Sequence, residues 1–213
     1  MKKFNNYITE RLKLTSKTNT NYYTCQPKDK FELRDILKER LAKDKNANLN
    51  DIDVSQITDM GWKGFRANKG LFEDLDPHDI DISEWNVSKC TNMNSMFCSC
   101  ENFNCDLSNW DVSNVTNMGI MFDGCENFTG KGLENWNVKN VVDMRVMFSG
   151  CTNFNCDLSN WDVSNVTNME FMFYYCDNFN CDLSKWNVSK VTNMDFMFFH
   201  CPSLKKFPSW YNK

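Results

Sequence analysis

The side chains best suited to chemistry in this sequence are its 11 cysteines. A thiolate can act as a nucleophile or bind zinc, so regularly spaced cysteines suggest both kinds of site. Two positions of a repeated pattern are cysteine, the first at Cys100, Cys125, Cys151, Cys176 and Cys201, and the second at Cys105, Cys156 and Cys181. Zinc sites usually use CxxC or paired histidines, whereas this sequence has Cys98-Ser99-Cys100 and two distant histidines, His78 and His200. We therefore expect reduced thiols in small core sites, no metal and no cofactor, with disulfides between repeats as the alternative.

Catalytic partners for these cysteines are scarce. His200 stands next to Cys201, which gives one candidate pair of base and nucleophile. The sequence contains no nucleophile elbow, no glycine-rich phosphate loop and no metalloprotease helix motif. We therefore predict that the chain is not an enzyme.

Aspartates also recur, and a column of them would suit calcium. They are Asp81, Asp106, Asp157 and Asp182, together with Asp111 and Asp162. The glycine-rich nonapeptide of calcium-binding β-rolls is absent, and Asp and Ser at such positions favour hydrogen bonds to turn amides. The Asn-Val-Ser and Asn-Val-Thr triplets match the glycosylation pattern but lie inside the repeated motif. We expect a structural role for both.

These residues belong to a repeat. Trp85, Trp110, Trp136, Trp161 and Trp186 recur at intervals of 25, 26, 25 and 25 residues. The string DLSNWDVSNVTNMGIMFDGC from Asp106 returns almost unchanged from Asp157, and the middle copy carries one inserted residue around Lys131 and Gly132. We predict a repeat region over 50–204, with an irregular first unit at 50–79 and five regular repeats at 80–204.

Each unit changes its hydrophobic period halfway along. Leu107, Trp110, Val112 and Val115 suit a short strand with tight turns. Thr116-Asn117 is a candidate helix N-cap, before Met118, Met121 and Phe122 at helical spacing. The pattern predicts an α/β repeat solenoid, a leucine-rich-repeat-like stack of short strand plus short helix units in which equivalent side chains form buried columns.

The ends of a solenoid need caps. Residues 1–49 form the predicted N-terminal cap, with an amphipathic helix at 28–43 that begins at Asp29 and Glu32 in a capping-box-like pattern. Residues 1–14 form a weaker amphipathic segment that is a candidate for self-association. Residues 205–213 form the C-terminal cap, in which Pro208, Trp210 and Tyr211 stop the repeat.

The motif W-D/N-V-S-x-V-T-N-M-x-x-M-F-x-x-C resembles the repeat of the BspA-like leucine-rich-repeat surface proteins of bacteria, over about residues 50–204. The resemblance implies a solenoid used in adhesion and protein contact, without catalytic residues, and a surface location. Similar repeats occur in gene products of gut bacteria and their phages, which implies an alternative role in which the protein binds and blocks a host protein.

Composition and charge limit the classes of partner that we expect. The formal charge of -4 is spread along the chain, which argues against nucleic acid. The basic start at Met1–Lys3 is not followed by an apolar h-region, and no apolar run approaches the roughly 18 residues of a membrane span. We expect a cytoplasmic protein without membrane insertion, whose partner is another protein.

Positions that vary between the copies indicate the binding surface, because they lie outside the shared core. Aromatic side chains gather at these positions in the last two repeats, at Phe171, Tyr174, Tyr175, Phe196, Phe199 and His200. We predict that they form the contact surface of a non-enzymatic protein-protein interaction module. Packing of these rings on Trp210 and Tyr211 is the alternative, and a structural component of a larger assembly, such as a virion or cell-surface layer, is the alternative function.

Overall fold

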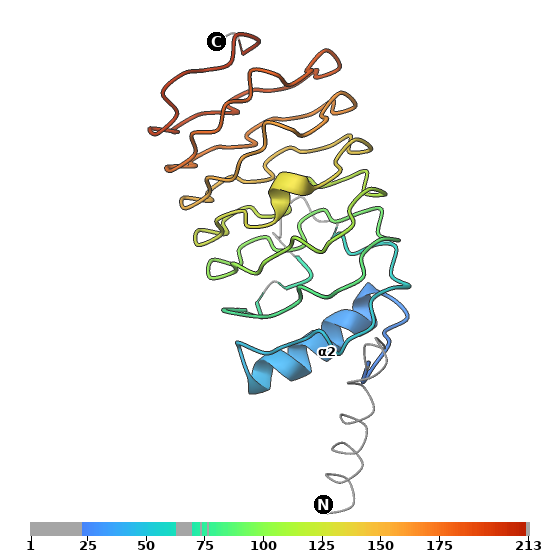
Figure 1. Cartoon of the computed structure of the whole chain (residues 1–213). Helices are drawn as coiled ribbons and strands as arrows, with labels where there is room; N and C mark the ends of the chain where they lie inside the picture. The colour runs from blue at the N-terminus through green and yellow to red at the C-terminus, as the bar shows by residue number, and fades with distance from the viewer. Residues whose placement is uncertain (1–22, 63–69, 73, 76, 212–213) are drawn as a thin grey trace, which may run out of the picture.

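The computed structural model describes residues 23–62, 70–72, 74–75 and 77–211 of the chain. The chain winds into successive turns that stack along one axis, with the N-terminal part at one end and the C-terminus at the other (Figure 1). We call each turn a rung. Rungs 1 to 5 begin at Asp81, Asp106, Gly132, Asp157 and Asp182. The predicted stacking of the repeats into one repeated fold is confirmed.

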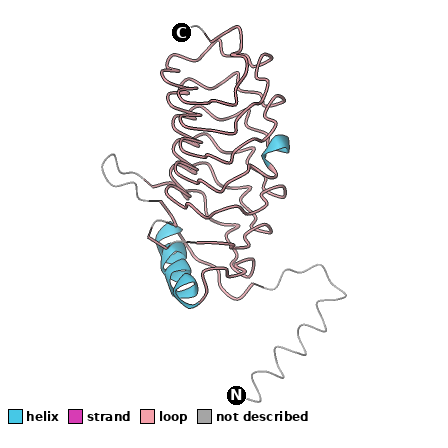
Figure 2. Cartoon of the chain, turned by 90° about the vertical axis from the view of Figure 1, so that its left-hand side faces the viewer, coloured by secondary structure: helices cyan, strands magenta, loops and turns pink. Residues whose placement is uncertain are grey.

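The predicted secondary structure within each rung is wrong. Instead of a short strand and a short helix, as in an α/β leucine-rich-repeat-like unit, the rungs consist mostly of tight turns (Figure 2). Among the described residues, the helices are α2 (Lys30–Lys43) and the 3-10 helix η1 (Leu133–Asn135). In the same residues, strand pairing is limited to isolated parallel bridges. One column of bridges joins Asp59, Asn92, Asn117, Asp143, Asn168 and Asn193.

Hydrogen bonds between rungs explain why the repeat helix does not form. Alternate backbone N–H groups of rung 2 donate to carbonyls of rung 3 rather than to carbonyls four residues earlier. The four bonds run from Met118 to Asp143, Ile120 to Arg145, Phe122 to Met147 and Gly124 to Ser149, at 2.7–3.0 Å. Ile120 has a φ of 61°, in the left-handed region, which interrupts any right-handed helix.

The helical spacing of apolar residues therefore has another cause. Met118, Met121 and Phe122 are buried as predicted, but they lie on consecutive tight turns, and the Met121 N–H donates to the Met118 carbonyl at 3.3 Å. Asn117 is not a helix N-cap. Its side-chain oxygen accepts from the N–H of Gly119 at 2.9 Å and closes a turn instead.

Columns of aromatic rings fill the core. The rings of Trp85 and Trp110 are 6.5 Å apart and 6° from parallel, and those of Trp110 and Trp136 are 6.4 Å apart and 4° from parallel. Each indole N–H donates to a carbonyl of the preceding rung, as from Trp136 to Leu107 at 3.2 Å. Buried indoles therefore keep a polar partner, and the predicted tryptophan register is confirmed.

The recurring aspartates close turns, as predicted. Asp106 accepts from the backbone N–H of Ser108 at 3.0 Å, and Asp157 accepts from the N–H of Ser159 at 2.9 Å. The same bond recurs at Asp81, Asp111, Asp162 and Asp182. In the part of the chain that the structure describes, no three His, Cys, Asp or Glu side chains form a group that could hold a metal ion.

The inserted residue of the middle repeat is absorbed at one corner. Gly132 has a φ of 94°, and a Cβ there would lie 2.3 Å from the backbone nitrogen of Ser108. A glycine is therefore required, and η1 follows at once. The tryptophan column runs past this corner without a change in ring spacing.

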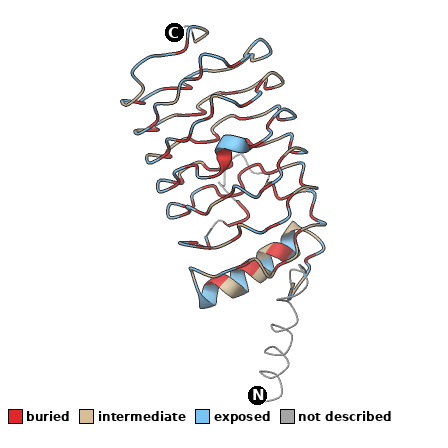
Figure 3. Ribbon diagram, viewed as in Figure 1, coloured by how far each residue is buried: buried red, intermediate tan, exposed pale blue. Residues whose placement is uncertain are grey.

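Helix α2 covers the N-terminal end of the stack, as predicted. Asp29 caps it by accepting from the N–H groups of Phe31 and Glu32. Its buried face consists of Leu33, Leu37 and Leu41 (Figure 3). Residues 1–14, the candidate segment for self-association, lie outside the described residues.

The C-terminal segment extends the repeat further than expected. Trp210 stacks on Trp186 at 6.4 Å and donates its indole N–H to the carbonyl of Leu183 at 3.0 Å. It is thus a sixth member of the tryptophan column rather than only a stop. Among the described residues, no backbone–backbone hydrogen bond joins the arm of rung 5, residues 194–200, to a later segment.

Candidate functional site

The structure brings all six predicted binding residues together. We call them the aromatic patch; they are Phe171, Tyr174, Tyr175, Phe196, Phe199 and His200. Three ring pairs join rung 4 to rung 5. Phe171 stacks on Phe196 at 5.2 Å, Tyr174 stacks on Phe199 at 5.3 Å, and Tyr175 stacks on His200 at 4.5 Å. Edge contacts join neighbouring pairs, as between Tyr174 and Tyr175 at 4.5 Å. The six rings therefore form one continuous surface.

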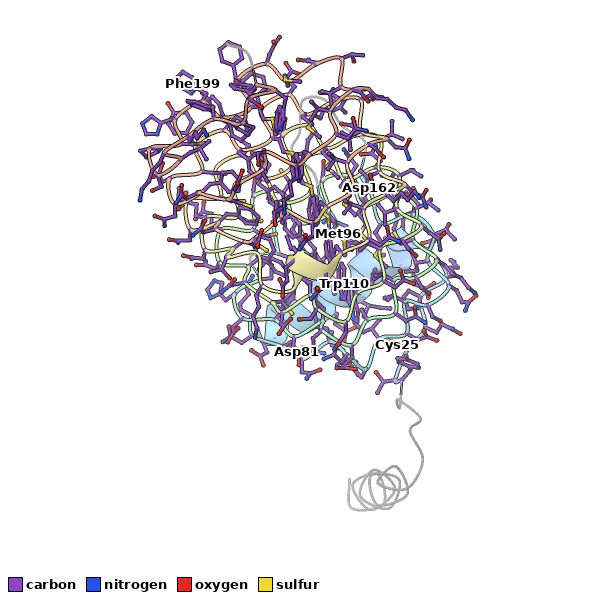
Figure 4. All side chains as sticks on the ribbon, turned by 45° about the horizontal axis from the view of Figure 1, so that its top comes forward. Cys25, Asp81, Met96, Trp110, Asp162 and Phe199 are labelled. Atoms are coloured by element: carbon purple, nitrogen blue, oxygen red, sulfur yellow. The ribbon has the colours of Figure 1, made fainter. Side chains whose placement is uncertain are left out.

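Several of these rings face solvent. Phe196 is 55% exposed, Phe199 47% and Tyr175 40%. Figure 4 shows Phe199 at the outside of the C-terminal end, whereas Trp110 lies inside the stack. Side chains of this size are usually buried, so the exposure of three of them in one cluster marks this surface as a candidate contact site.

The C-terminal cap packs elsewhere. Trp210 stacks on Trp186, and Tyr211 lies edge-on to Phe198 at 5.0 Å. Among the described residues, the rings of the aromatic patch contact one another and not the rings of Trp210 or Tyr211. The alternative that these rings cover the cap is therefore not what the geometry shows.

Two columns of left-handed residues position the patch. The first holds Ser95, Ile120, Val146, Phe171 and Phe196, and the second holds Ser99, Gly124, Gly150, Tyr175 and His200. A left-handed φ costs a non-glycine residue about 1–2 kcal/mol. Rungs 2 and 3 avoid that cost in the second column with Gly124 and Gly150, whereas rungs 4 and 5 place Tyr175 and His200 there at φ 55°.

Acidic groups surround the aromatic patch. The Nδ1 of His200 lies 3.5 Å from a carboxylate oxygen of Asp177. Glu170 and Asp195 directly precede Phe171 and Phe196 in the chain. The rim of the patch therefore carries negative charge.

A hollow of about 710 Å³ adjoins the patch on the top of rung 5. Its walls include Met194, Phe196, Phe198, Phe199, Phe207 and Tyr211. Phe196 and Phe199 of the patch thus form one side of the hollow, and Phe207 and Tyr211 of the C-terminal segment also line it.

Burial raises the pKa of four thiols at the first cysteine position of the repeat, those of Cys125, Cys151, Cys176 and Cys201. All 11 cysteines are free, and nine are buried as predicted, whereas Cys25 and Cys181 are half-buried. The Cys201 thiol donates to the carbonyl of Phe173 at 2.9 Å, and burial raises its pKa to about 11. Cys125 donates in the same way to Phe97 at 3.0 Å. Such thiols carry little thiolate at neutral pH, despite the adjacent His200.

A second aromatic cluster with an exposed ring was not predicted from the sequence. Phe31 is 60% exposed and meets the ring of Trp62 edge-on at 5.4 Å. Lys30 and Arg34 place their cations 5.6 and 5.5 Å from the Trp62 ring. The sequence carried one signal for this pair, because Phe31 lies outside the stripe of Leu33, Leu37 and Leu41 that forms the buried face of helix α2.

The comparisons with known proteins identify a family. The family model described as "Mycoplasma protein of unknown function, DUF285" matches residues 32–132 and 121–212. No curated protein and no solved structure matches the chain. In the described residues, no helix is both long and apolar enough to cross a membrane.

Proposed function

We propose that this chain, which belongs to the DUF285 family of Mycoplasma proteins of unknown function, is a non-enzymatic protein-protein interaction module. The aromatic patch is its contact surface. The observation that carries this proposal is the continuous surface of six rings across rungs 4 and 5, of which Phe196, Phe199 and Tyr175 are exposed. Exposed aromatic clusters are frequent anchors of protein interfaces.

Backbone conformation supports the same surface. Tyr175 and His200 occupy left-handed positions that rungs 2 and 3 fill with glycine. Stability alone favours glycine there, because it adopts such angles without steric cost. Strained residues that persist against this preference are frequently functional.

Two further observations are consistent with a binding role. The repeat motif resembles that of BspA-like surface proteins, whose leucine-rich-repeat solenoids serve adhesion and protein contact. The buried thiols argue against catalysis, since burial raises the pKa of Cys201 to about 11. A thiol in that state is a poor nucleophile.

The test compares capture of partners from the natural source by three purified proteins. The patch variant carries Tyr174→Ser, Tyr175→Ser, Phe199→Ser and His200→Ser. The control carries Glu101→Ser, Glu126→Ser and Lys185→Ser, at exposed positions outside the patch. All three must share a circular dichroism spectrum and a cooperative thermal transition.

A partner that binds wild type and control, and is lost from the patch variant, is the expected result. Its affinity is then measured with purified components, and we expect at least a tenfold loss, because several contact rings are removed together. Equal binding to the patch variant would overturn the proposal and favour a structural role in an assembly.

A further inference from the structure

The charged side chains of the rungs are separated between two parts of each turn. We call the segment of a rung that carries the patch positions its strip, and the five strips are residues 93–103, 118–128, 144–154, 169–179 and 194–204. The strips hold six carboxylates, at Glu101, Asp123, Glu126, Glu170, Asp177 and Asp195. The lysines of residues 81–204 all lie between the strips, at Lys89, Lys131, Lys139, Lys185 and Lys190. Charges that are scattered along the sequence are therefore gathered by the stacking of the rungs.

Few cations are available to neutralise the strips. Arg145 is the only lysine or arginine within them, and its guanidinium lies 3.4 Å from the carboxylate of Asp143, just outside the strip of rung 3. Among the described residues, none of the six strip carboxylates forms an ion pair with a lysine or arginine. Between the strips, by contrast, Lys131 pairs with Asp106 at 2.8 Å. The strips thus carry negative charge that these cations do not compensate.

In rung 4 these carboxylates flank the rings of the aromatic patch on both sides. Glu170 directly precedes Phe171, and Asp177 follows Tyr175 by two residues. The side chain of Asp177 is 48% exposed, and its buried Oδ1 accepts no hydrogen bond from the described residues. Tyr175 remains 40% exposed although the ring of His200 in rung 5 stacks on it. The rings and carboxylates of rung 4 therefore belong to the side of the stack, between rungs 3 and 5.

This combination of rings and carboxylates suits cationic side chains. Lysine and arginine have an aliphatic stem that packs on apolar surface, and a charged head that pairs with carboxylates and is attracted to aromatic rings. The phosphates of nucleic acids and anionic membranes would be repelled by the same carboxylates. A second copy that docked through this surface would bring carboxylates against carboxylates. Charge complementarity therefore favours a basic segment of a partner protein.

We infer that the aromatic patch and the carboxylates beside it bind a segment of a partner protein that is rich in arginine and lysine. The aliphatic stems of this segment pack on the rings of the patch, and its cations pair with Glu170, Asp177 and Asp195. This inference rests on the proposed function, and it specifies the chemistry of the partner. Because salt screens exposed charges, the binding weakens as the ionic strength rises.

The experiment selects peptides on the full chain from a random phage-displayed library, and the selected peptides are then synthesised. We expect arginine and lysine to be enriched about threefold or more over the unselected library, and aspartate and glutamate to be depleted. The affinity of the synthetic peptides is measured by fluorescence anisotropy. We expect it to fall about tenfold between about 0.05 and 0.5 M sodium chloride, because the Debye length shortens over this range.

Two variants that lose the same number of charges locate the contact. The flank variant carries Glu170→Gln, Asp177→Asn and Asp195→Asn. The charge control carries Glu84→Gln, Glu101→Gln and Glu126→Gln, at exposed positions of rungs 1 and 2.

We expect the selected peptides to bind the flank variant about tenfold more weakly than wild type, because several ion pairs are lost together. The charge control should lose less than about threefold, since rung 3 separates its charges from the rings by about a Debye length. Both variants must keep the wild-type melting temperature within a few degrees. If the flank variant is unfolded, the composition of the selected peptides and the salt dependence decide.

The outcomes separate this inference from the proposed function. Selected peptides without basic enrichment, a library that yields no binding peptide, or equal binding to the flank variant and the charge control would overturn the basic partner. If peptides that are not basic bind wild type and are lost from the patch variant, the aromatic patch remains the contact surface without this class of partner. If basic peptides are lost from the flank variant but bind the patch variant as well as wild type, the basic partner stands and the rings are not its contact surface.

Discussion

The imidazole of His200 lies 4.5 Å from the ring of Tyr175, with the two planes 11° apart, and both residues have a φ of 55°. The same φ at equivalent positions of successive rungs is consistent with the parallel arrangement of the two rings. The stack therefore sets the spacing of its surface groups as well as that of its core. A side chain at one such position is aligned with its neighbours without any contact specific to the pair.

The left-handed angle of Tyr175 predicts an unusual order of stabilities. Tyr175→Gly should be more stable than Tyr175→Ala by about 1 kcal/mol, because both lose the ring and only alanine keeps the strained φ. Urea unfolding of the two variants measures the difference. An alanine variant as stable as the glycine variant would contradict the assigned backbone conformation.

Trp136→Ala should be strongly destabilising. The ring is buried, stacks on Trp110 and donates to Leu107, so its removal leaves a cavity and an unpaired carbonyl. We expect a loss of about 3–5 kcal/mol in the free energy of unfolding. Trp210→Ala, at the less buried end of the same column, is the matched control and should cost clearly less. Equal losses would contradict the column.

The thiols should react in two classes. Burial raises the pKa of Cys105 to about 11 and that of Cys156 to about 12, so at pH 8 about one in a thousand of such Cys105 groups is a thiolate. A colorimetric thiol reagent should modify half-buried Cys25 first, and Cys25→Ser should remove that phase. In denaturant all 11 thiols should titrate. A lower count would indicate disulfides.

Acid should destabilise the turns that aspartates close. Lys131 and Ser108 hydrogen-bond to Asp106 and lower the pKa of its carboxyl from 3.8 to about 2. Because the folded-state pKa is the lower one, this stabilisation is fully present above about pH 4 and is lost as the pH falls toward 2. Urea midpoints between pH 5 and 2 should fall, and the fall should be smaller in Asp106→Asn. An identical fall would assign the effect to other carboxylates.

Tryptophan spacing and helix α2 could be predicted from the sequence because both depend on local pattern. Trp136 marks a period, and Asp29 carries its own capping signal. The conformation of the repeat could not be predicted in the same way. Met118, Met121 and Phe122 have helical spacing, but the N–H groups on either side of Met121 donate to the next rung, and such bonds leave no mark on local sequence.

The candidate site was likewise predictable from the sequence only in part. Variation among the copies was sufficient to find Phe171 and Phe196, because an aromatic side chain is visible in the sequence. The left-handed φ of 54° at both residues could not be found that way, since phenylalanine has no preference for that conformation.

The corner at Gly132 shows that the perimeter of a rung can change while its core does not. Rung 2, residues 106–131, carries one residue more than its neighbours, and the tryptophan spacing from rung 2 to rung 3 is 6.4 Å, against 6.5 Å from rung 1 to rung 2. Because neighbouring units are nearly identical, unequal recombination between their coding segments would add or delete whole units, and the columns of the core would continue through the new number of units.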